Sequence, residues 1–338
     1  MGTKSLTGLI CPRCRRRAAE QTSPVVHCPR DGFALVAASV LADADGDPLL
    51  GMTVVDRYVV FGKIGRGATG TVYRSFDTRE QRFVALKILR ADWAHGTRAR
   101  ARFECEARVL SMLSSPNTVR LLDVGEFELA VGDDLSAPGP SRFLAMEMLE
   151  GEPLGKRLDR VGRLPVAEAI RWATHALGSL AEAHDKGIVH RDITPANVFI
   201  ARVNGGDEVG KVVDFGLAVF AREVFPDGET FAAIGTPRYM SPEQARGEVL
   251  DGRSDLYSVG LLLYQMLTGR PPFTDGDAAR VMARHMHEVP LPMGVVAPDA
   301  GIPQWLSDVV VRALAKRPDD RSRTAAELMA ALGAGVLD

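Results

Sequence analysis

Two short segments place oxygen-bearing side chains where they could accept a proton and hold a divalent cation. Segment 190–197 reads HRDITPAN and lies between two short apolar runs, and Pro195 prevents a regular strand through it, so we expect a rigid loop. In this loop Asp192 could accept a proton from an attacking hydroxyl, and Asn197 could hold a metal. Asp214 follows another apolar run and adds an oxygen ligand of the hard type that Mg²⁺ prefers.

A glycine-rich segment could cover phosphate groups. Residues 65–72 read GRGATGTV, and Gly65, Gly67 and Gly70 would let backbone N–H groups approach a phosphate because glycine has no Cβ. A tight hairpin would use the same glycines. The segment lies between two expected strands and does not open a helix, which argues against a dinucleotide-binding fold and favours a flap over phosphates.

A lysine and a glutamate are expected to pair. Lys87 ends the apolar run 84–86, and a lysine on a buried strand must reach solvent or find a partner. Glu106 lies on the apolar face of a helix expected over 98–113, where an unpaired carboxylate would be costly. Two unrelated surface charges would explain the lysine but not the position of Glu106, so we predict that the two residues pair.

The elements that must position these residues follow from hydrophobic periodicity. Strands are expected around 58–64, 71–74 and 83–88, where alternation and β-branched residues stand between glycine-rich or charged breaks. From residue 164 the pattern is mostly helical, and segment 254–268 is apolar nearly all round, which predicts a buried central helix. The expected fold class is therefore α+β, with a small β-rich half followed by a larger α-rich half.

Composition narrows the class of protein further. The net charge of −2 offers no field that would draw the chain to nucleic acid, so no nucleic-acid partner is expected. No stretch reaches the roughly 18 apolar residues of a membrane helix, and Cys11 and a run of arginines arrive too early for a signal peptide. We expect a cytoplasmic protein without a membrane segment, whose four cysteines serve metal binding or packing and not disulfides.

With these motifs in place, residues 56–334 resemble a eukaryotic-like (Hanks-type) serine/threonine protein kinase of the bacterial branch. Segment 241–243, Ser-Pro-Glu, stands for the family's usual Ala-Pro-Glu. The resemblance implies the two-lobed kinase fold, with a β-rich N-lobe over 55–149 and an α-rich C-lobe over 150–335. It also implies transfer of the γ-phosphate of ATP, with Mg²⁺, to serine or threonine hydroxyls of protein substrates.

The resemblance assigns roles to individual residues. Those that would enclose ATP are Ile64, Gly65, Gly67, Gly70, Val72, Ala85, Met146 as gatekeeper, and the backbone of Glu147 and Leu149 as the adenine-binding hinge. Those that would act in catalysis are Lys87 on the α- and β-phosphates, Glu106 as its partner, Asp192 on the substrate hydroxyl, and Asn197 and Asp214 on Mg²⁺. Those with structural roles would be Glu243 and Arg321, as a buried ion pair, and Asp255 at the start of the buried helix.

One position departs from the family pattern. Thr194 stands where serine/threonine kinases usually carry a lysine that meets the γ-phosphate, and a hydroxyl supplies no positive charge there. This keeps an alternative open, a nucleotide-binding pseudokinase that acts as a signalling scaffold. A small-molecule phosphotransferase on the same fold is disfavoured by segment 241–243 and by Thr236, which resembles the serine/threonine version of the substrate loop.

Regulation by phosphorylation is expected as well. Arg191 directly precedes Asp192, as in kinases whose activation loop is ordered when a phosphate pairs with arginine. Thr230 lies six residues before Thr236, where bacterial relatives commonly autophosphorylate, and is the predicted activating site. Autophosphorylation in trans would require a dimer.

The N-terminal residues resemble a degenerate zinc ribbon. Residues 1–34 form this zinc-ribbon-like module, and residues 35–54, with a cluster of Asp, Gly and Pro, are expected to be a linker. A structural Zn²⁺ site needs four ligands. The candidates are Cys11, Cys14 and Cys28, with Asp31 or His27 as the fourth. The alternative is a cysteine-containing tail without fixed structure, because a segment this small cannot bury enough core to fold unaided.

Overall fold

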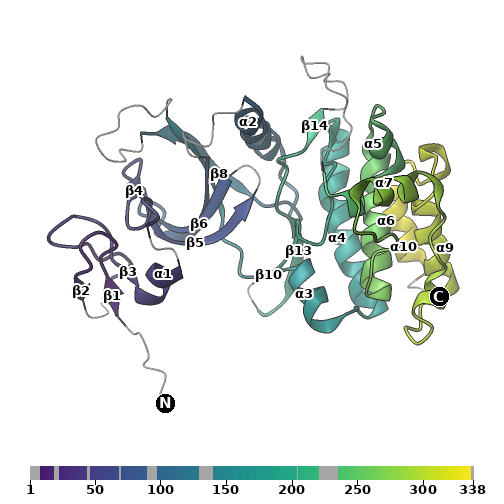
Figure 1. Ribbon diagram of the computed structural model, residues 1–338, viewed down its shortest axis with the longest axis horizontal. Helices are drawn as coiled ribbons and strands as arrows, with labels where there is room; N and C mark the ends of the chain where they lie inside the picture. The colour runs from purple at the N-terminus through teal and green to yellow at the C-terminus, as the bar shows by residue number, and fades with distance from the viewer. Residues whose placement is uncertain are drawn as a thin grey trace. The chain divides into compact units, whose positions relative to one another are not determined.

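The computed structural model describes residues 8–18, 23–43, 46–67, 70–89, 97–128, 140–203, 205–220 and 235–335. The chain divides into two compact units (Figure 1). Unit 1 comprises Met1–Ala107 and Arg120–Leu149, and unit 2 comprises Arg108–Val119 and Glu150–Asp338. Unit 1 is built on a β-sheet and unit 2 mostly on helices, so the expected α+β class is confirmed.

Unit 1 contains an antiparallel six-stranded sheet in the order β4-β5-β6-β7-β9-β8. The strands are β4 (Thr53–Val54), β5 (Tyr58–Gly67), β6 (Gly70–Asp77), β7 (Arg82–Leu89), β8 (Leu121–Phe127) and β9 (Ser141–Glu147). The helix α2 (Thr97–Met112) begins in this unit (Figure 1). The three strands expected from alternation lie within β5, β6 and β7, where β-branched and aromatic side chains fit a pleated surface.

The register of this sheet separates two faces. Val72 lies opposite Lys87, and Ala85 lies opposite Met146, so these four side chains share one face. The other face carries the core of the unit, because residues one position along each strand point the opposite way. This core contains Tyr58, Val60, Tyr73, Val84, Leu86, Ile88, Phe143 and Ala145. Full burial of each large apolar side chain contributes about 1.5–3 kcal/mol.

The N-terminal residues of unit 1 pack against this sheet. A small three-stranded sheet, in the order β2-β1-β3, joins β1 (Leu9–Ile10), β2 (Arg17–Ala18) and β3 (Val36–Ala37), and α1 (Ala38–Asp43) follows. Where the sequence predicts a linker over 35–54, the structure has β3, α1 and β4. Five side chains of this segment belong to the same core as the six-stranded sheet: Val36, Leu41, Leu49, Leu50 and Val54.

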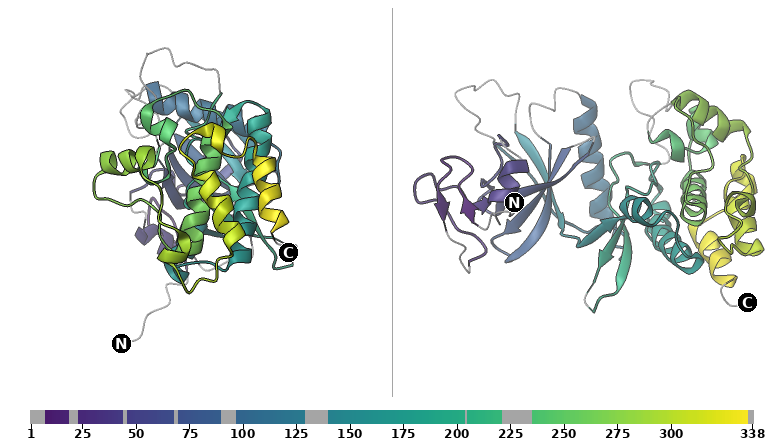
Figure 2. Two further views of the ribbon diagram at one scale, coloured as in Figure 1. Left: turned by 90° about the vertical axis from the view of Figure 1, so that its right-hand side faces the viewer. Right: turned by 60° about the horizontal axis from the view of Figure 1, so that its bottom comes forward.

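Unit 2 consists mostly of helices and also contains short strands. The helices are α3 (Leu154–Val161), α4 (Val166–Asp185), α5 (Pro242–Arg246), α6 (Gly252–Thr268), α7 (Ala278–His287), α8 (Met293–Val296), α9 (Gln304–Ala313) and α10 (Ala325–Ala334). The strands are β10 (Gly151–Pro153), β11 (Ile188–Val189), β12 (Val198–Arg202), β13 (Glu208–Val212) and β14 (Val219–Phe220). The helices coloured from teal to yellow pack side by side in Figure 2.

The expected buried central helix is α6. Thirteen of its residues are buried, which matches its apolar character on all sides. The helix begins after Asp251, whose side chain accepts a hydrogen bond from the N–H of Arg253, and ends at Gly269 in the left-handed region. Among the described residues, none of the helices combines the length and the apolar character needed to cross a membrane.

Gly51 lies close to Pro12 and Ala34 of the N-terminal residues, and it provides a test of this packing. Its φ is +75°, and a Cβ would lie 2.5 Å from the carbonyl oxygen of Ala34 and 2.8 Å from Cγ of Pro12. Gly46 has a similar φ of +83° but nothing within 4 Å of a Cβ, so it is a matched control.

We expect Gly51→Ala to lower the free energy of unfolding by clearly more than Gly46→Ala. Both substitutions meet the cost of the left-handed conformation, about 1–3 kcal/mol, and only Gly51→Ala adds a steric clash. Urea denaturation of the full chain measures both. Equal losses for the two variants would contradict the packing described here.

Candidate active site

In unit 1, the charged centre of the candidate site is a buried ion pair. Lys87 on β7 donates from Nζ to both carboxylate oxygens of Glu106 on α2, at 2.7 Å and 2.6 Å. Glu106 is fully buried, and Lys87 is only 4% exposed. Removing either partner would leave an uncompensated buried charge. The structure thus joins the two residues that the sequence predicts to pair, and it holds the ammonium group at a defined place on the sheet.

The residues expected to enclose ATP lie on or near one face of the sheet. Val72, Ala85 and Met146 share that face with Lys87, as the strand register requires. Ile64 is 49% exposed at the start of the glycine-rich segment. The apolar side chains form a surface on which a flat ring could lie, with the lysine beside it.

The glycines of the glycine-rich segment lie where β5 turns into β6. Gly65 pairs with Val72, and Gly67 pairs with Gly70. A Cβ on Gly70 would lie 2.5 Å from the carbonyl oxygen of Ile88, so only glycine fits there. The tip, residues 68–69, lies outside the described residues.

The expected hinge follows β9. The N–H of Glu147 donates to the carbonyl oxygen of Arg120 at 3.0 Å, and its side chain accepts from the N–H of Arg120 at 2.8 Å. These two bonds hold the backbone of Glu147 in place. Leu149, two residues further on, is half-buried and is the last residue of unit 1.

In unit 2, Asp192 lies at the centre of a hydrogen-bonded group. Asn197 donates from Nδ2 to Asp192 Oδ2 at 2.9 Å and to its carbonyl oxygen at 2.9 Å. Thr236 donates to Asp192 Oδ1 from its hydroxyl at 2.9 Å and from its N–H at 3.1 Å. The carboxylate is therefore oriented from both sides. Because the amide nitrogen of Asn197 binds Asp192, its oxygen Oδ1 is the atom that could hold a metal.

Asp214 lies beside this group. It follows β13, and its Oδ1 accepts the N–H of Gly216 at 2.8 Å. The N–H of Val213 donates to the carbonyl oxygen of Asn197 at 3.0 Å, which ties the two segments together. The structure thus brings the carboxylate of Asp214 and the amide of Asn197 onto adjoining segments, and both offer the oxygen ligands that suit Mg²⁺.

The loop that carries Asp192 is anchored on Asp255 of α6. The backbone N–H groups of His190 and Arg191 donate to the two oxygens of Asp255, each at 2.8 Å, and His184 Nε2 lies 2.8 Å from Oδ2. Burial acts to raise the pKa of Asp255, but its hydrogen bonds with His184 and with the backbone N–H of His190 hold that pKa below its usual value. Arg191 has φ of +69°, a strained conformation that this anchor maintains.

The ring of His190 is held neutral. It is fully buried beside Phe215, with 4.6 Å between the ring centroids, and burial lowers the pKa of His190. Its Nδ1 accepts the N–H of Asp192 at 3.2 Å, as a neutral imidazole can. The histidine therefore helps to orient the backbone of Asp192 without adding charge beside it.

The remaining predicted residues of the loop region are placed as follows. Thr194 is buried, and its carbonyl oxygen accepts the N–H of Asn197 at 3.0 Å. Arg191 donates from Nε to the carbonyl oxygen of Leu217 at 2.6 Å. Thr230 lies outside the described residues. Thr194 thus supplies no positive charge at the position where the family pattern has lysine.

Glu243 and Arg321 form a buried ion pair below the loop. Arg321 donates from both terminal nitrogens to Glu243, at 2.7 Å and 2.9 Å, and Ser254 donates to the same carboxylate at 2.6 Å. Burial acts to raise the pKa of Glu243, but the guanidinium of Arg321 holds that pKa below its usual value. The pair connects α5 to the last part of the chain.

Sequence reasoning missed three contributing residues. They are His184, which binds Asp255, Ser254, which binds Glu243, and Gln244, whose Nε2 donates to the carbonyl oxygen of Arg191 at 2.8 Å. Gln244 also completes a capping box with Ser241, and the spacing Ser-x-x-Gln could have indicated that role. No local signal pointed to His184, because its partner lies 71 positions away along the chain.

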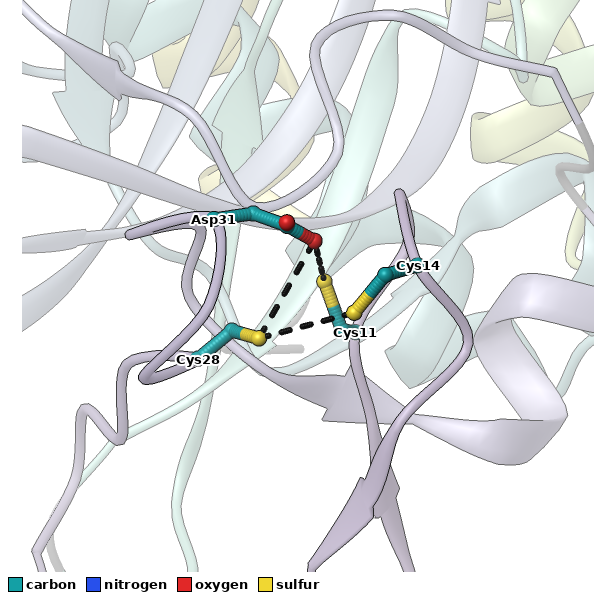
Figure 3. A group of neighbouring side chains, drawn as sticks. All are labelled: Cys11, Cys14, Cys28 and Asp31. Atoms are coloured by element: carbon teal, nitrogen blue, oxygen red, sulfur yellow. Dashed lines mark hydrogen bonds between the residues drawn. The ribbon is translucent and has the colours of Figure 1, made fainter.

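A separate group of side chains could bind a metal. The ligand atoms of Cys11, Cys14, Cys28 and Asp31 all lie within 4.8 Å of one another (Figure 3). The Cys11 thiol donates to Asp31 Oδ2 at 3.3 Å, and the sulfur atoms of Cys14 and Cys28 are 3.6 Å apart. His27, the other candidate for fourth ligand, is not part of this group.

Comparisons with known proteins agree with the motifs. A family model described as protein kinase domain matches residues 58–331. The serine/threonine-protein kinase pkn3 of Myxococcus xanthus is 36% identical over 294 residues, which is 86% of this chain and 52% of that protein. PknB of Mycobacterium leprae (strain TN), also named as a serine/threonine-protein kinase, is 39% identical over 277 residues, 82% of this chain and 42% of that protein. The chain spans about half the length of these relatives.

We expect Glu243→Gln to lower the free energy of unfolding by about 3–5 kcal/mol, because Arg321 would remain buried without a counter-charge. Glu248→Gln is the matched control, since Glu248 is exposed and its oxygen lies 3.9 Å from Arg246. That control should cost about 0.5 kcal/mol or less. Urea denaturation compares the two variants, and a loss below about 1 kcal/mol for Glu243→Gln would contradict the structural role of the pair.

Proposed function

We propose that this chain, which belongs to the protein kinase domain family, transfers the γ-phosphate of ATP to serine and threonine hydroxyls of proteins. The observation that carries the proposal is the hydroxyl of Thr236, which donates to Asp192 Oδ1 at 2.9 Å. An alcohol can therefore reach the carboxylate that would accept its proton. The names of the relatives as serine/threonine-protein kinases support the choice of substrate hydroxyl.

Asp192 would act on the attacking hydroxyl. Its Oδ2 accepts a hydrogen bond from Asn197, and its Oδ1 accepts one from the Thr236 hydroxyl. A substrate hydroxyl in the place of the Thr236 hydroxyl would be oriented by Oδ1 and would give its proton to it. Thr236, which now donates to that oxygen, would share the carboxylate with the substrate. In phosphoryl transfer most of the catalytic effect comes from such positioning and from neutralising charge.

Asn197 and Asp214 would hold Mg²⁺ through oxygen atoms. The fit rests on the donor set, an amide oxygen and a carboxylate on adjoining segments, because Mg²⁺ takes few protein oxygens and completes its shell with phosphate and water. The ion would supply positive charge to the transferred phosphate. Lys87 would contact the α- and β-phosphates, and Glu106 would hold its ammonium group in place.

The adenine would lie against Val72 and Ala85. Met146 would limit the depth of the site, and Gly65, Gly67 and Gly70 would cover the phosphates. Glu147 and Leu149 would bind the adenine edge through their backbone, and the two bonds that fix Glu147 to Arg120 support this assignment.

A pseudokinase is the second candidate function, and Thr194 is the observation that favours it. Its side chain cannot provide the cation that a lysine would give to the γ-phosphate. Against this alternative, Lys87, Asp192, Asn197 and Asp214 are all present, and their hydrogen bonds orient them. We therefore favour a kinase with a weakened phosphate contact over a scaffold without activity.

Regulation, location and metal binding are parts of the same proposal. Phosphorylation of Thr230 would activate the domain, and a second copy acting in trans would require a transient dimer.

Zn²⁺ would be bound by Cys11, Cys14, Cys28 and Asp31, whose thiolates and carboxylate fit its tetrahedral preference. The cytoplasm suits both ATP and reduced thiols. The module boundaries 1–34, 35–54 and 55–335 remain predictions.

Asp192→Asn tests catalysis. We expect autophosphorylation with Mg-ATP to fall by about 10²–10⁴-fold, because the proton acceptor is lost while the shape of the side chain is kept. Asp207→Asn, at an exposed loop position of unit 2, is the matched control and should keep wild-type activity. Phosphate incorporation is measured by mass spectrometry of the intact protein. Equal activity of Asp192→Asn and wild type would refute the assignment of Asp192.

Thr194→Lys tests the departure from the family pattern. A charge-assisted contact to phosphate is roughly twice as strong as a neutral one, so we expect the rate to rise by about tenfold. Single-turnover phosphate transfer separates this effect from product release. If wild type binds ATP but transfers no phosphate, and the lysine variant transfers it, the natural chain is a pseudokinase.

A further inference from the structure

The four candidate metal ligands belong to two turns of the same shape. The first turn reads Cys-Pro-Arg-Cys-Arg over 11–15, and the second reads Cys-Pro-Arg-Asp-Gly over 28–32. In each turn the fifth residue donates its N–H to the carbonyl oxygen of the first, at 3.1 Å and 2.9 Å. In each turn that fifth residue also has positive φ, +62° at Arg15 and +72° at Gly32. Asp31 therefore occupies the place in the second turn that Cys14 occupies in the first.

The second turn is joined to the sheet by a chain of backbone hydrogen bonds. Ala34, two residues after the turn, donates its N–H to the carbonyl oxygen of Gly51 at 2.8 Å. The N–H of Gly51 donates to the carbonyl oxygen of Val60 at 2.9 Å, and the N–H of Val60 donates to the carbonyl oxygen of Met52 at 2.9 Å. Val60 lies in β5, the strand whose far end carries the glycine-rich segment. The second turn and the strand that carries the glycine-rich segment are thus joined by one chain of backbone hydrogen bonds.

The first turn makes contact with the same place. Pro12 lies between Cys11 and Cys14, and its Cγ is 2.8 Å from the position that a Cβ on Gly51 would take. Both turns therefore converge on Gly51, next to the edge strand β4. The carbonyl oxygen of Gly51, two residues before this edge strand, is paired with the N–H of Ala34.

Side chains from the N-terminal part of the chain pack on both faces of the sheet near this edge. Ala34 packs with Val59 and Phe76 on one face of the sheet. Leu49 and Leu50 belong to the core on the other face. A polar contact adds to them, because the Tyr73 hydroxyl on β6 donates to Asp47 Oδ2 at 2.8 Å.

The module has little else to hold it together. The buried cluster around it consists of Cys11 and Cys28, with Leu35 from the following segment and a few partly buried neighbours. Two of these three core residues are candidate metal ligands, so the core and the site are the same structure. Without a cation the site is held only by weak hydrogen bonds of its thiols, such as the one from Cys11 to Asp31 Oδ2 at 3.3 Å. A segment of this size buries too little apolar surface to fold unaided, and a bound metal supplies the missing stabilisation.

We propose that a metal ion bound by Cys11, Cys14, Cys28 and Asp31 is a structural part of the nucleotide-binding lobe. Loss of the metal releases the two turns from Gly51 and loosens β5, the strand that carries the glycine-rich segment. The lobe then unfolds at lower temperature and binds ATP less tightly. The affinity part of this inference rests on the proposed ATP binding, whereas the stability part does not.

The test uses the full chain, purified with Zn²⁺ and then treated with a chelator. We expect one zinc ion per chain by elemental analysis. Its removal should lower the midpoint of thermal unfolding by at least about 5 °C. It should also weaken binding of a non-hydrolysable ATP analogue by at least about fivefold, as for a typical coupling between sites. Added Zn²⁺ should restore both values.

Two cysteine variants distinguish the effect of losing a metal ligand from the effect of losing a cysteine outside the site. Cys14→Ser should lower zinc content and reproduce the effects of the chelator. Cys105→Ser is the matched control, because Cys105 lies on α2 and is not part of the group of ligands. If Cys14→Ser does not fold, the chelated wild type still provides the comparison.

Gly51→Ala tests the path between site and sheet. It should retain zinc but show a smaller zinc-dependent shift of the unfolding midpoint than Gly46→Ala. The inference is overturned if the chain binds no zinc, or if removing zinc leaves the midpoint unchanged. An unchanged affinity for the ATP analogue with a lowered midpoint would overturn its affinity part. Absence of any nucleotide binding, with or without zinc, would count against the proposed function and would leave the midpoint as the deciding measurement for the metal.

Discussion

The buried carboxylate of Asp255 is the constraint on which the candidate catalytic loop depends. Its two oxygens accept hydrogen bonds from the backbone N–H groups of His190 and Arg191, and one of them also contacts His184. These hydrogen bonds take the place of the solvent that the buried carboxylate lacks. This arrangement keeps Arg191 in its strained conformation and directs Asp192 toward Asn197 and Thr236. The helix α6 must therefore be buried, because only a rigid, water-free position makes the carboxylate a firm anchor.

Unit 1 uses a buried charge in a comparable way. Lys87 is held on the sheet by Glu106, while the apolar residues around it share the face on which a nucleotide would lie. The opposite face is closed by the core that segment 35–54 helps to build. The position of the ammonium group consequently depends on packing behind the sheet as well as on its ion pair, and the zinc-ribbon-like module contributes to that packing through Ile10, which packs against this core.

Several elements could be predicted because their signal is local. Alternating side chains predicted β5 to β7, the apolar character of 254–268 predicted the burial of α6, and an acidic residue on an apolar helix face predicted the partner of Lys87. The structure of segment 35–54 was harder to predict from the sequence. Its small residues and its Asp-Gly-Pro cluster are typical of a linker, whereas Leu49 and Leu50 are buried only because the six-stranded sheet offers them a surface.

The sequence by itself determined the chemistry: the order and spacing of the glycines, Lys87, Asp192, Asn197 and Asp214, and the family to which the chain belongs. Tertiary structure alone decided which side chains meet. It grouped Asp31, and not His27, with the three cysteines, and it brought His184 to Asp255 and Ser254 to the pair of Glu243 and Arg321. The physical reason is that periodicity reports which face of an element is buried, whereas a partner far along the chain is set by how the buried faces pack.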